Sequence, residues 1–254
     1  MEALLIKGLN AYIRYHDLPG GEPALVFVHG LGSASSSSFP RILCHPEIVA
    51  RRAILIDLLG FGFSDRPTGF GYGIEEHADT IAQVLEHLGP KSCTVIGHSM
   101  GGSIAINLAS RYPALVMNLI VAEGNLDPGP GIVSGPTCAQ SEEQYVKTGY
   151  AAFLRVLASK GWADYAGTVQ ASDPLAMYRS AVSLIGDRQP TFREQLLALS
   201  IPRTFIFGQK TLPSPDVEVL STQGINVRIV ENSGHDMMTD NPNGFAEEIA
   251  RGLS

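Results

Sequence analysis

Residues 93–101, CTVIGHSMG, decide the fold of this 254-residue chain. Cys93–Gly97 is a short apolar run with β-branched side chains, which predicts a strand buried on both faces. The next residues match the pattern Gly-x-Ser-x-Gly, and Gly101–Arg111 then shows a helical pattern. A serine at such a junction is typical of a nucleophile held on a tight turn at the carboxyl edge of a sheet, and the glycines are needed because a Cβ would clash across the turn. The alternative interpretation is an ordinary glycine-rich loop.

Apolar runs of the same kind alternate with helical patterns along most of the chain. The further predicted strands are Ala24–His29, Ala53–Asp57, Met117–Glu123, Arg203–Gly208 and Asn226–Glu231. The helices predicted between and after them are Ile74–Leu88, Asp216–Thr222 and Asn243–Arg251. Ala3–His16 is expected to form an antiparallel hairpin at the sheet edge. This alternation predicts an α/β fold with a mostly parallel, doubly wound sheet and helices on both faces.

One long region breaks the alternation, because residues 125–200 contain no strand pattern. Its Pro/Gly-rich start, residues 128–136, is expected to be a loop. The helices expected after this loop are Glu142–Lys160, Asp173–Gly186 and Thr191–Leu199, the second with Asp173 as its capping residue. We therefore predict a core formed by residues 1–124 and 201–254, and a helical cap, or lid, formed by residues 125–200.

Ser99 needs a base to act as a nucleophile, since a free serine hydroxyl is a poor nucleophile at neutral pH. His235 is the best candidate among the seven histidines. It follows the last predicted strand and precedes the last helix, which places it at the same edge of the sheet as Ser99. His98 adjoins Ser99 but is expected to point away from the turn. The histidines assigned to surface helices or loops are His16, His45, His77 and His87.

Backbone N–H groups are expected to stabilise the charge that develops on a carbonyl oxygen under attack. The loop HGLG, residues 29–32, follows the first parallel strand and would supply the N–H of Leu31. The N–H of Met100, at the start of the helix after Ser99, would supply the second donor. His29 is expected to brace this loop.

Four motifs resemble those of the α/β-hydrolase fold superfamily, in order and spacing, between about residues 26 and 241. They are the HG-x-G loop at 29–32, the D-x-x-G-x-G-x-S segment at 57–64, the G-x-S-x-G turn at 97–101 and Gly234-His235. The resemblance is to the branch with a serine nucleophile and a helical cap inserted after the sixth strand. It implies that residues 125–200 cover an active site and that the activity is esterase-like or lactonase-like, but these motifs do not select a substrate.

The acid that would orient the base departs from the commonest pattern of that superfamily. Many members carry G-x-x-D after the strand that follows the cap, whereas residues 208–211 read GQKT, so that Thr211 stands where the aspartate would be. Other branches place the acid at the end of the sixth strand, which here is Glu123. A glutamate that ends an apolar strand is costly unless it is paired. Glu123 is therefore the first choice, ahead of Asp216 and Asp127.

Together these residues predict a serine hydrolase with the triad Ser99, His235 and Glu123, which cleaves a carboxylic ester or a lactone of a small to medium apolar substrate through an acyl-enzyme. The alternatives on the same triad are an amidase, a C–C bond hydrolase and a perhydrolase, and a non-enzymatic small-molecule receptor that retains the triad also stays open. The residues expected to contact the substrate are Gly30, Phe153, Trp162 and Met237.

Composition excludes several other classes of protein. The formal net charge of −7, with no basic run beyond Arg51-Arg52, argues against nucleic acid as a partner. No signal peptide or membrane span is visible, so we expect a cytoplasmic protein without membrane contact. The three cysteines are an odd number without CxxC spacing, which fits a reducing compartment. No metal or organic cofactor is implied, the expected partner is a small-molecule substrate, and the oligomeric state stays open.

Overall fold

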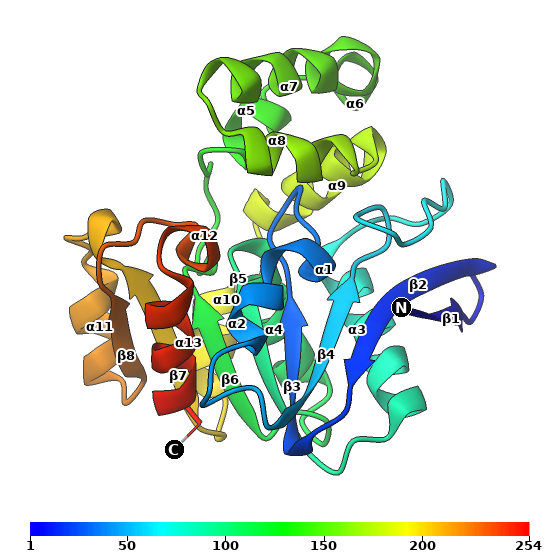
Figure 1. Cartoon of the computed structure of the whole chain (residues 1–254). Helices are drawn as coiled ribbons and strands as arrows, with labels where there is room; N and C mark the ends of the chain where they lie inside the picture. The colour runs from blue at the N-terminus through cyan, green and yellow to red at the C-terminus, as the bar shows by residue number, and fades with distance from the viewer. Residues whose placement is uncertain (254) are drawn as a thin grey trace.

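The computed structural model describes residues 1–253 and is built around one eight-stranded sheet (Figure 1). Its strands are β1 (Glu2–Ile6), β2 (Ala11–Leu18), β3 (Gly21–Val28), β4 (Arg51–Asp57), β5 (Cys93–His98), β6 (Asn118–Ala122), β7 (Arg203–Gly208) and β8 (Asn226–Val230). They lie in the order β1-β2-β4-β3-β5-β6-β7-β8, with β2 antiparallel to both neighbours and the strands from β4 to β8 parallel. The predicted α/β fold, its edge hairpin and its parallel strands are confirmed.

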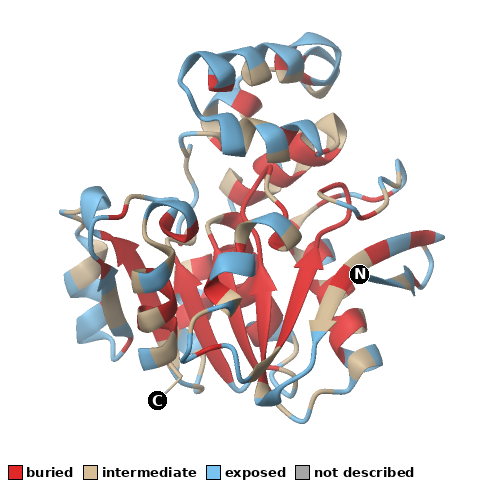
Figure 2. Cartoon of the chain, viewed as in Figure 1, coloured by how far each residue is buried: buried red, intermediate tan, exposed pale blue. Residues whose placement is uncertain are grey.

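Two apolar cores form on the two faces of the sheet, because successive side chains of a strand point to opposite faces. In β3, Val26 and Val28 belong to one core and Leu25 and Phe27 to the other, and all four are fully buried. Helices α3 (Ile74–Leu88) and α4 (Met100–Arg111) cover the first face, and α2 (Pro40–Leu43), α12 (Met237–Asp240) and α13 (Pro242–Arg251) cover the second. Figure 2 shows the central strands buried along most of their length. No helix within residues 1–253 is both long enough and apolar enough to span a bilayer.

The helices between β6 and β7 stand above the carboxyl edge of the sheet in Figure 1. They are α5 (Ser134–Cys138), α6 (Glu142–Gln144), a π-helical turn (Tyr145–Gly149), α7 (Tyr150–Ser159), α8 (Ala163–Gln170) and α9 (Pro174–Ile185). Asp173 caps α9 as predicted, because its carboxylate accepts hydrogen bonds from the first turn. The next helix, α10 (Phe192–Ala198), instead packs against α4 of the core, where Asn107 Nδ2 donates to Gln195 Oε1 at 3.1 Å. The span expected to form the cap therefore ends with a helix that lies on the core.

Some short helices have no recognisable helical sequence pattern, because tertiary contacts rather than the local sequence stabilise them. Helix α5 begins inside the Pro/Gly-rich stretch that was expected to be a loop, so that expectation was wrong for residues 134–136. Helix α1 (Ser35–Ser38) is only one turn long and depends on Asp57, whose carboxylate accepts hydrogen bonds from the Ser36 N–H at 2.9 Å and from its hydroxyl at 2.8 Å. Isolated helices of this length are unstable in water, so packing rather than propensity forms them. After β7 follow a 3-10 turn (Gln209–Thr211) and α11 (Asp216–Thr222).

Candidate active site

Ser99 occupies the strained turn that its sequence motif predicts, between β5 and α4. Its backbone has φ 53° and ψ −124°, a region that side-chain-bearing residues rarely adopt. The turn is possible because two glycines flank it: a Cβ on Gly97 would lie 2.2 Å from the Gly101 carbonyl oxygen, and a Cβ on Gly101 would lie 2.3 Å from the Val28 carbonyl oxygen. The Ser99 N–H donates to Ala122 of the neighbouring β6 at 2.9 Å. The strain is thus supported by the strands on either side.

Glu123 and His235 meet at this edge of the sheet. Glu123 directly follows β6 and, like Ser99, has a positive φ, of 45°. His235 comes from the loop between β8 and α12, and its Nδ1 lies 2.6 Å from Glu123 Oε2. An ionised carboxylate only accepts hydrogen bonds, so Nδ1 carries the proton and Nε2 is left free to act as a base. Within residues 1–253, Ser99 Oγ and His235 share no hydrogen bond, and in substrate-free enzymes this contact is often long.

Thr211 holds the second oxygen of the same carboxylate, which the sequence reading did not foresee. Glu123 Oε1 accepts from the Gly208 N–H at 2.8 Å and from Thr211 Oγ1 at 2.5 Å. In the sequence, Thr211 stands where many family members carry the aspartate. Because Thr211 follows β7 and Glu123 follows the neighbouring β6, this position of Thr211 was the signal that could have indicated the contact.

The charges of this pair shift both pKa values in the direction that catalysis requires. Burial lowers the pKa of His235, but the hydrogen bond and the negative charge of Glu123 raise it by more, so that the net pKa is above the ordinary value. Burial raises the pKa of Glu123, but hydrogen bonds from His235, Thr211 and the Gly208 N–H lower it by more. Glu123 is therefore ionised at neutral pH and stabilises a protonated His235.

The loop at residues 29–33, which we call the oxyanion loop, lies against the nucleophile turn. A Cβ built on Gly30 would lie 3.2 Å from Ser99 Cβ. His29 braces the loop as expected: its Nε2 accepts from the Leu58 N–H at 3.1 Å, so its Nδ1 donates to the Gly30 carbonyl at 2.8 Å. Because C=O and N–H point in opposite directions in a trans peptide, this bond aims the N–H of Leu31 away from His29.

The N–H groups of Leu31 and Met100 are free to bind a ligand oxygen, since neither donates to an acceptor within the described residues 1–253. Met100 opens α4, where the first amides have no partner within the helix and the helix dipole favours negative charge. The arrangement therefore brings a serine hydroxyl, a histidine paired with an ionised carboxylate, and two unpaired backbone N–H groups to one edge of the sheet.

A sequence profile of the alpha/beta hydrolase fold family matches residues 23–173, which is more than half of the chain. The chain belongs to this family. It is 35% identical over 107 residues to 2-hydroxy-6-oxo-2,4-heptadienoate hydrolase of Pseudomonas putida, an alignment that spans 42% of this chain and 38% of that protein. It is 32% identical over 187 residues to a 2-hydroxymuconate semialdehyde hydrolase of Pseudomonas putida, spanning 74% of this chain and 62% of that protein. These alignments thus cover less than two thirds of each relative.

Solved structures agree on the architecture. A thermophilic esterase from Thermogutta terrifontis superposes with a TM-score of 0.83 at 19% sequence identity, and the superposition covers 99% of this chain and 97% of that one. At such low identity the likeness shows the fold alone. It supports the alpha/beta hydrolase fold that the four motifs indicated.

The alternative acids lie elsewhere in this family member. Asp216 and Asp127 both pair with the guanidinium of Arg193, at 2.8 Å and 2.5 Å. Asp216 is also the first residue of α11 rather than its cap. Both carboxylates are thus engaged in joining α10 to its surroundings, and neither contacts His235.

Two other histidines are buried near the site. His98 donates from Nε2 to the His235 carbonyl at 2.9 Å, and burial, together with the charge of His235, lowers its pKa to about 3. His98 therefore supports the His235 loop as a neutral ring. His77 was expected on the surface, and this was wrong: it is fully buried in α3, with Nε2 3.1 Å from Ser180 Oγ of α9. The cap covers this face of α3, which the sequence of α3 alone does not reveal.

The four residues expected to contact the substrate differ in their position and burial. Gly30 lies beside Ser99, and Phe153 is half-buried in α7. Trp162 is 44% exposed, with Lys160 Nζ 4.9 Å from its ring centre, so it lies on the outside of the cap. Met237 is 0% exposed and packs in the second core, and its contact with a substrate stays a prediction. Tyr165 of the cap forms a hydrogen bond with the oxyanion loop, and no sequence pattern points to it because one tyrosine in a weak helical pattern carries no motif.

Proposed function

We propose that this protein is a serine hydrolase that cleaves a carboxylic ester or a lactone of a small to medium apolar substrate. The observation that carries the proposal is the 2.6 Å contact between His235 Nδ1 and Glu123 Oε2, at the same edge of the sheet as the strained Ser99. A nucleophile, a base and an orienting acid, with unpaired amides beside them, form the set that acyl transfer requires.

The reaction follows from these positions in two halves. Ser99 Oγ attacks the ester carbonyl while His235 Nε2 takes its proton, and the N–H groups of Leu31 and Met100 stabilise the oxyanion. His235 then protonates the leaving alcohol, which departs and leaves an acyl group on Ser99. In the second half, His235 takes a proton from water as the water oxygen attacks the acyl carbonyl; the bond to Ser99 Oγ then breaks, His235 returns the proton to Ser99 Oγ, and the acid is released. Glu123 holds the correct tautomer of His235 throughout.

The side chains that face the oxyanion loop favour an apolar substrate. Val169 of α8 and Met177 of α9 lie against Gly32, and both are fully buried. Both side chains are packed against the loop here, so a ligand would contact them only where it displaces this packing, and it would then gain about 25 cal/mol per Å² of apolar area buried. Neither of these two side chains carries a charge that would pair with a carboxylate or an ammonium ion.

A second candidate is the hydrolysis of a C–C bond. The alignment with the 2-hydroxymuconate semialdehyde hydrolase of Pseudomonas putida covers 74% of this chain, which favours this alternative over an amidase or a perhydrolase. The same serine and histidine would be used on a carbonyl flanked by the bond to be cleaved.

The decisive experiment measures hydrolysis of p-nitrophenyl esters from acetyl to dodecanoyl by the wild type, Ser99→Ala and Ser103→Ala. Ser103 is a matched control, because it lies in the first turn of α4, four residues after Ser99, but its hydroxyl donates to the Asn125 carbonyl at 2.8 Å. We expect turnover in the wild type and Ser103→Ala that is absent in Ser99→Ala, with an optimum at short to medium acyl chains.

The same three proteins are then given 2-hydroxymuconate semialdehyde. Ser99-dependent cleavage of this compound without ester turnover would replace the ester proposal by the C–C alternative. An absence of Ser99-dependent turnover on both substrate types would refute the enzymatic proposal and leave the small-molecule receptor.

A further inference from the structure

Within the described part of the chain, the cap forms one hydrogen bond with the oxyanion loop. Tyr165 of α8 donates its hydroxyl proton to the carbonyl oxygen of Leu31 at 2.9 Å. Around this bond the contact is close: a Cβ on Gly32 would lie 2.8 Å from Val169 Cγ2 and 3.0 Å from the Tyr165 hydroxyl. The loop at this point has room only for glycine, so α8 and the oxyanion loop are fitted to each other.

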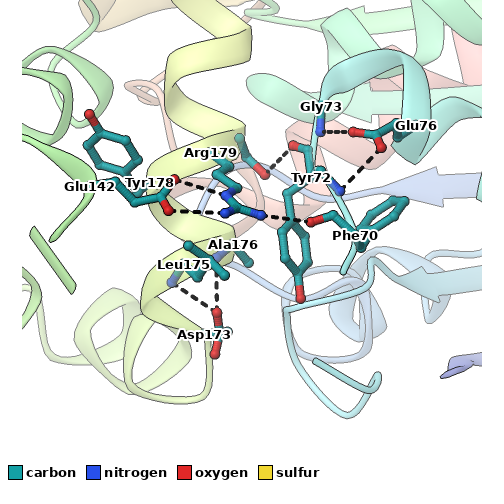
Figure 3. Close-up of polar contacts among 12 residues, drawn as sticks. Phe70, Tyr72, Gly73, Glu76, Glu142, Asp173, Leu175, Ala176, Tyr178 and Arg179 are labelled. Atoms are coloured by element: carbon teal, nitrogen blue, oxygen red, sulfur yellow. Dashed lines mark hydrogen bonds and ion pairs between the residues drawn. The ribbon is translucent and has the colours of Figure 1, made fainter. Parts of the chain in front are cut away.

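The neighbouring cap helix, α9, is fastened to the core independently of this contact. Arg179 binds Glu142 of α6 at 2.9 Å and donates to the Phe70 carbonyl of the core at 3.2 Å, as Figure 3 shows. Ser180 donates to the Tyr72 carbonyl at 2.9 Å. Further along α9, Ser183 Oγ accepts from the Ile74 N–H at 3.0 Å. Helix α9 is thus a fixed part of the cap.

Helix α8 has far fewer polar ties to the core. Among the described residues, Tyr165 is the only member of α8 whose side chain forms a hydrogen bond with the core. Beyond the end of the helix, Arg66 donates to the Ala171 carbonyl at 2.7 Å. The remaining tie of α8 is internal to the cap, where the Tyr150 hydroxyl donates to the Val169 carbonyl at 2.5 Å. Helix α8 is thus held on the oxyanion loop by the packing of Val169 and by one side-chain hydrogen bond, from the Tyr165 hydroxyl.

Two hydrogen bonds fix Leu31 from opposite sides. His29 holds the carbonyl of the peptide before Leu31, at Gly30, and Tyr165 holds the carbonyl of the peptide after it. Together they restrict both backbone torsions of Leu31 and so the direction of its N–H. The bond from His29 belongs to the core, whereas the bond from Tyr165 exists only while α8 lies on the loop.

We propose that Tyr165 is a positioning residue for the oxyanion hole, which holds the Leu31 N–H in its productive direction when α8 is seated on the loop. This inference rests on the proposed function of the site. It makes seating of the cap a condition for full transition-state stabilisation, so that substrates which let α8 close are turned over faster. Burial and the nearby charge of Asp236 raise the pKa of Tyr165, so its hydroxyl stays protonated and can donate throughout the neutral range.

The test compares Tyr165→Phe with Tyr178→Phe on one p-nitrophenyl ester. Tyr178 is a matched control, because its hydroxyl also ties the cap together but donates to the Gln140 carbonyl at 2.9 Å, away from the loop. Loss of an entire oxyanion donor lowers kcat by about 100-fold to 1,000-fold, and loosening one donor should have a smaller effect. We expect kcat of Tyr165→Phe to fall about ten-fold with KM within two-fold of wild type, and Tyr178→Phe to match the wild type.

Hydrogen exchange on the substrate-free proteins gives a readout that does not depend on turnover. We expect faster exchange at the amide of Ser33, which donates to the Gly30 carbonyl at 3.2 Å, and at the amides of α8, in Tyr165→Phe only. An unchanged kcat, a rise in KM alone, or an equal loss in Tyr178→Phe would overturn the inference. If the wild type shows no Ser99-dependent turnover, the proposed function fails, while unchanged exchange in Tyr165→Phe would separately refute the link between Tyr165 and the loop.

Discussion

Replacing Glu123 by glutamine tests whether this residue is the acid of the triad. The two carboxylate oxygens have different partners: Oε1 accepts from the Gly208 N–H at 2.8 Å, and Oε2 accepts from His235 Nδ1 at 2.6 Å. A backbone N–H cannot reverse its role, so the amide oxygen of the glutamine must take the position of Oε1. The NH₂ group then faces His235 Nδ1, which has to become the acceptor.

This change moves the proton of His235 to the wrong nitrogen. With Nδ1 as an acceptor, neutral His235 carries its proton on Nε2, and Nε2 can no longer take the proton of Ser99. The corresponding asparagine substitution in a serine protease lowers kcat by about 10⁴ for this reason. We expect kcat of Glu123→Gln to fall by about 10³ to 10⁴, with KM changed less than three-fold because Glu123 reaches the substrate only through His235.

The assay is steady-state hydrolysis of p-nitrophenyl butyrate by the wild type, Glu123→Gln and Asp216→Asn. Asp216 is the matched control, since it is an acid of the same region that pairs with Arg193 at 2.8 Å instead of with the base. Asp216→Asn should keep kcat within two-fold. If Glu123→Gln retains a tenth or more of wild-type kcat, or if Asp216→Asn shows the larger loss, the assignment of Glu123 is wrong.

Four further outcomes are expected. The acid limb of kcat/KM should have its midpoint above pH 6.5, the ordinary pKa of histidine, because Glu123 raises the pKa of His235 and only neutral His235 is a base. A pH profile of kcat/KM from pH 5 to 9 tests this, and a midpoint below pH 6.5 would contradict it. Thr211→Val should lower kcat about five-fold by removing a donor to Glu123, whereas Thr211→Ser should restore it, and equal losses in both would argue against the hydroxyl. Gly97→Ala should lower the free energy of unfolding by about 3 kcal/mol in urea titrations and abolish turnover, since its Cβ would lie 2.2 Å from a carbonyl oxygen. Trp162→Ala should keep kcat/KM within two-fold of the wild type, because the ring is 44% exposed on the outside of the cap. A larger fall would indicate that Trp162 does contact the substrate.

The fold could be predicted from the sequence because each of its main elements follows from a pattern of neighbouring residues. Buried parallel strands appear as continuous apolar runs, and helices such as α3 appear as apolar residues at helical spacing. The glycines of residues 97–101 likewise predict a tight turn that only small residues permit. In the structure Ser99 lies in this turn with φ 53°. Among the elements that were missed, α5 and α8 lack such a pattern because contacts with the rest of the cap stabilise them.

The composition of the candidate site depended on the tertiary structure to a greater degree. Sequence motifs singled out Ser99 and His235, but Glu123 and His235 are 112 positions apart, and only the packing of β6 beside β7 and β8 brings them within 2.6 Å. Tyr165 and Leu31 are separated by 134 positions, and no pattern links them. The sequence by itself determined the strands, the turn and the order of the motifs, because these follow from neighbouring residues. The tertiary structure decided the partners of Glu123 and the contact of Tyr165, because such pairings arise only when distant segments are packed together.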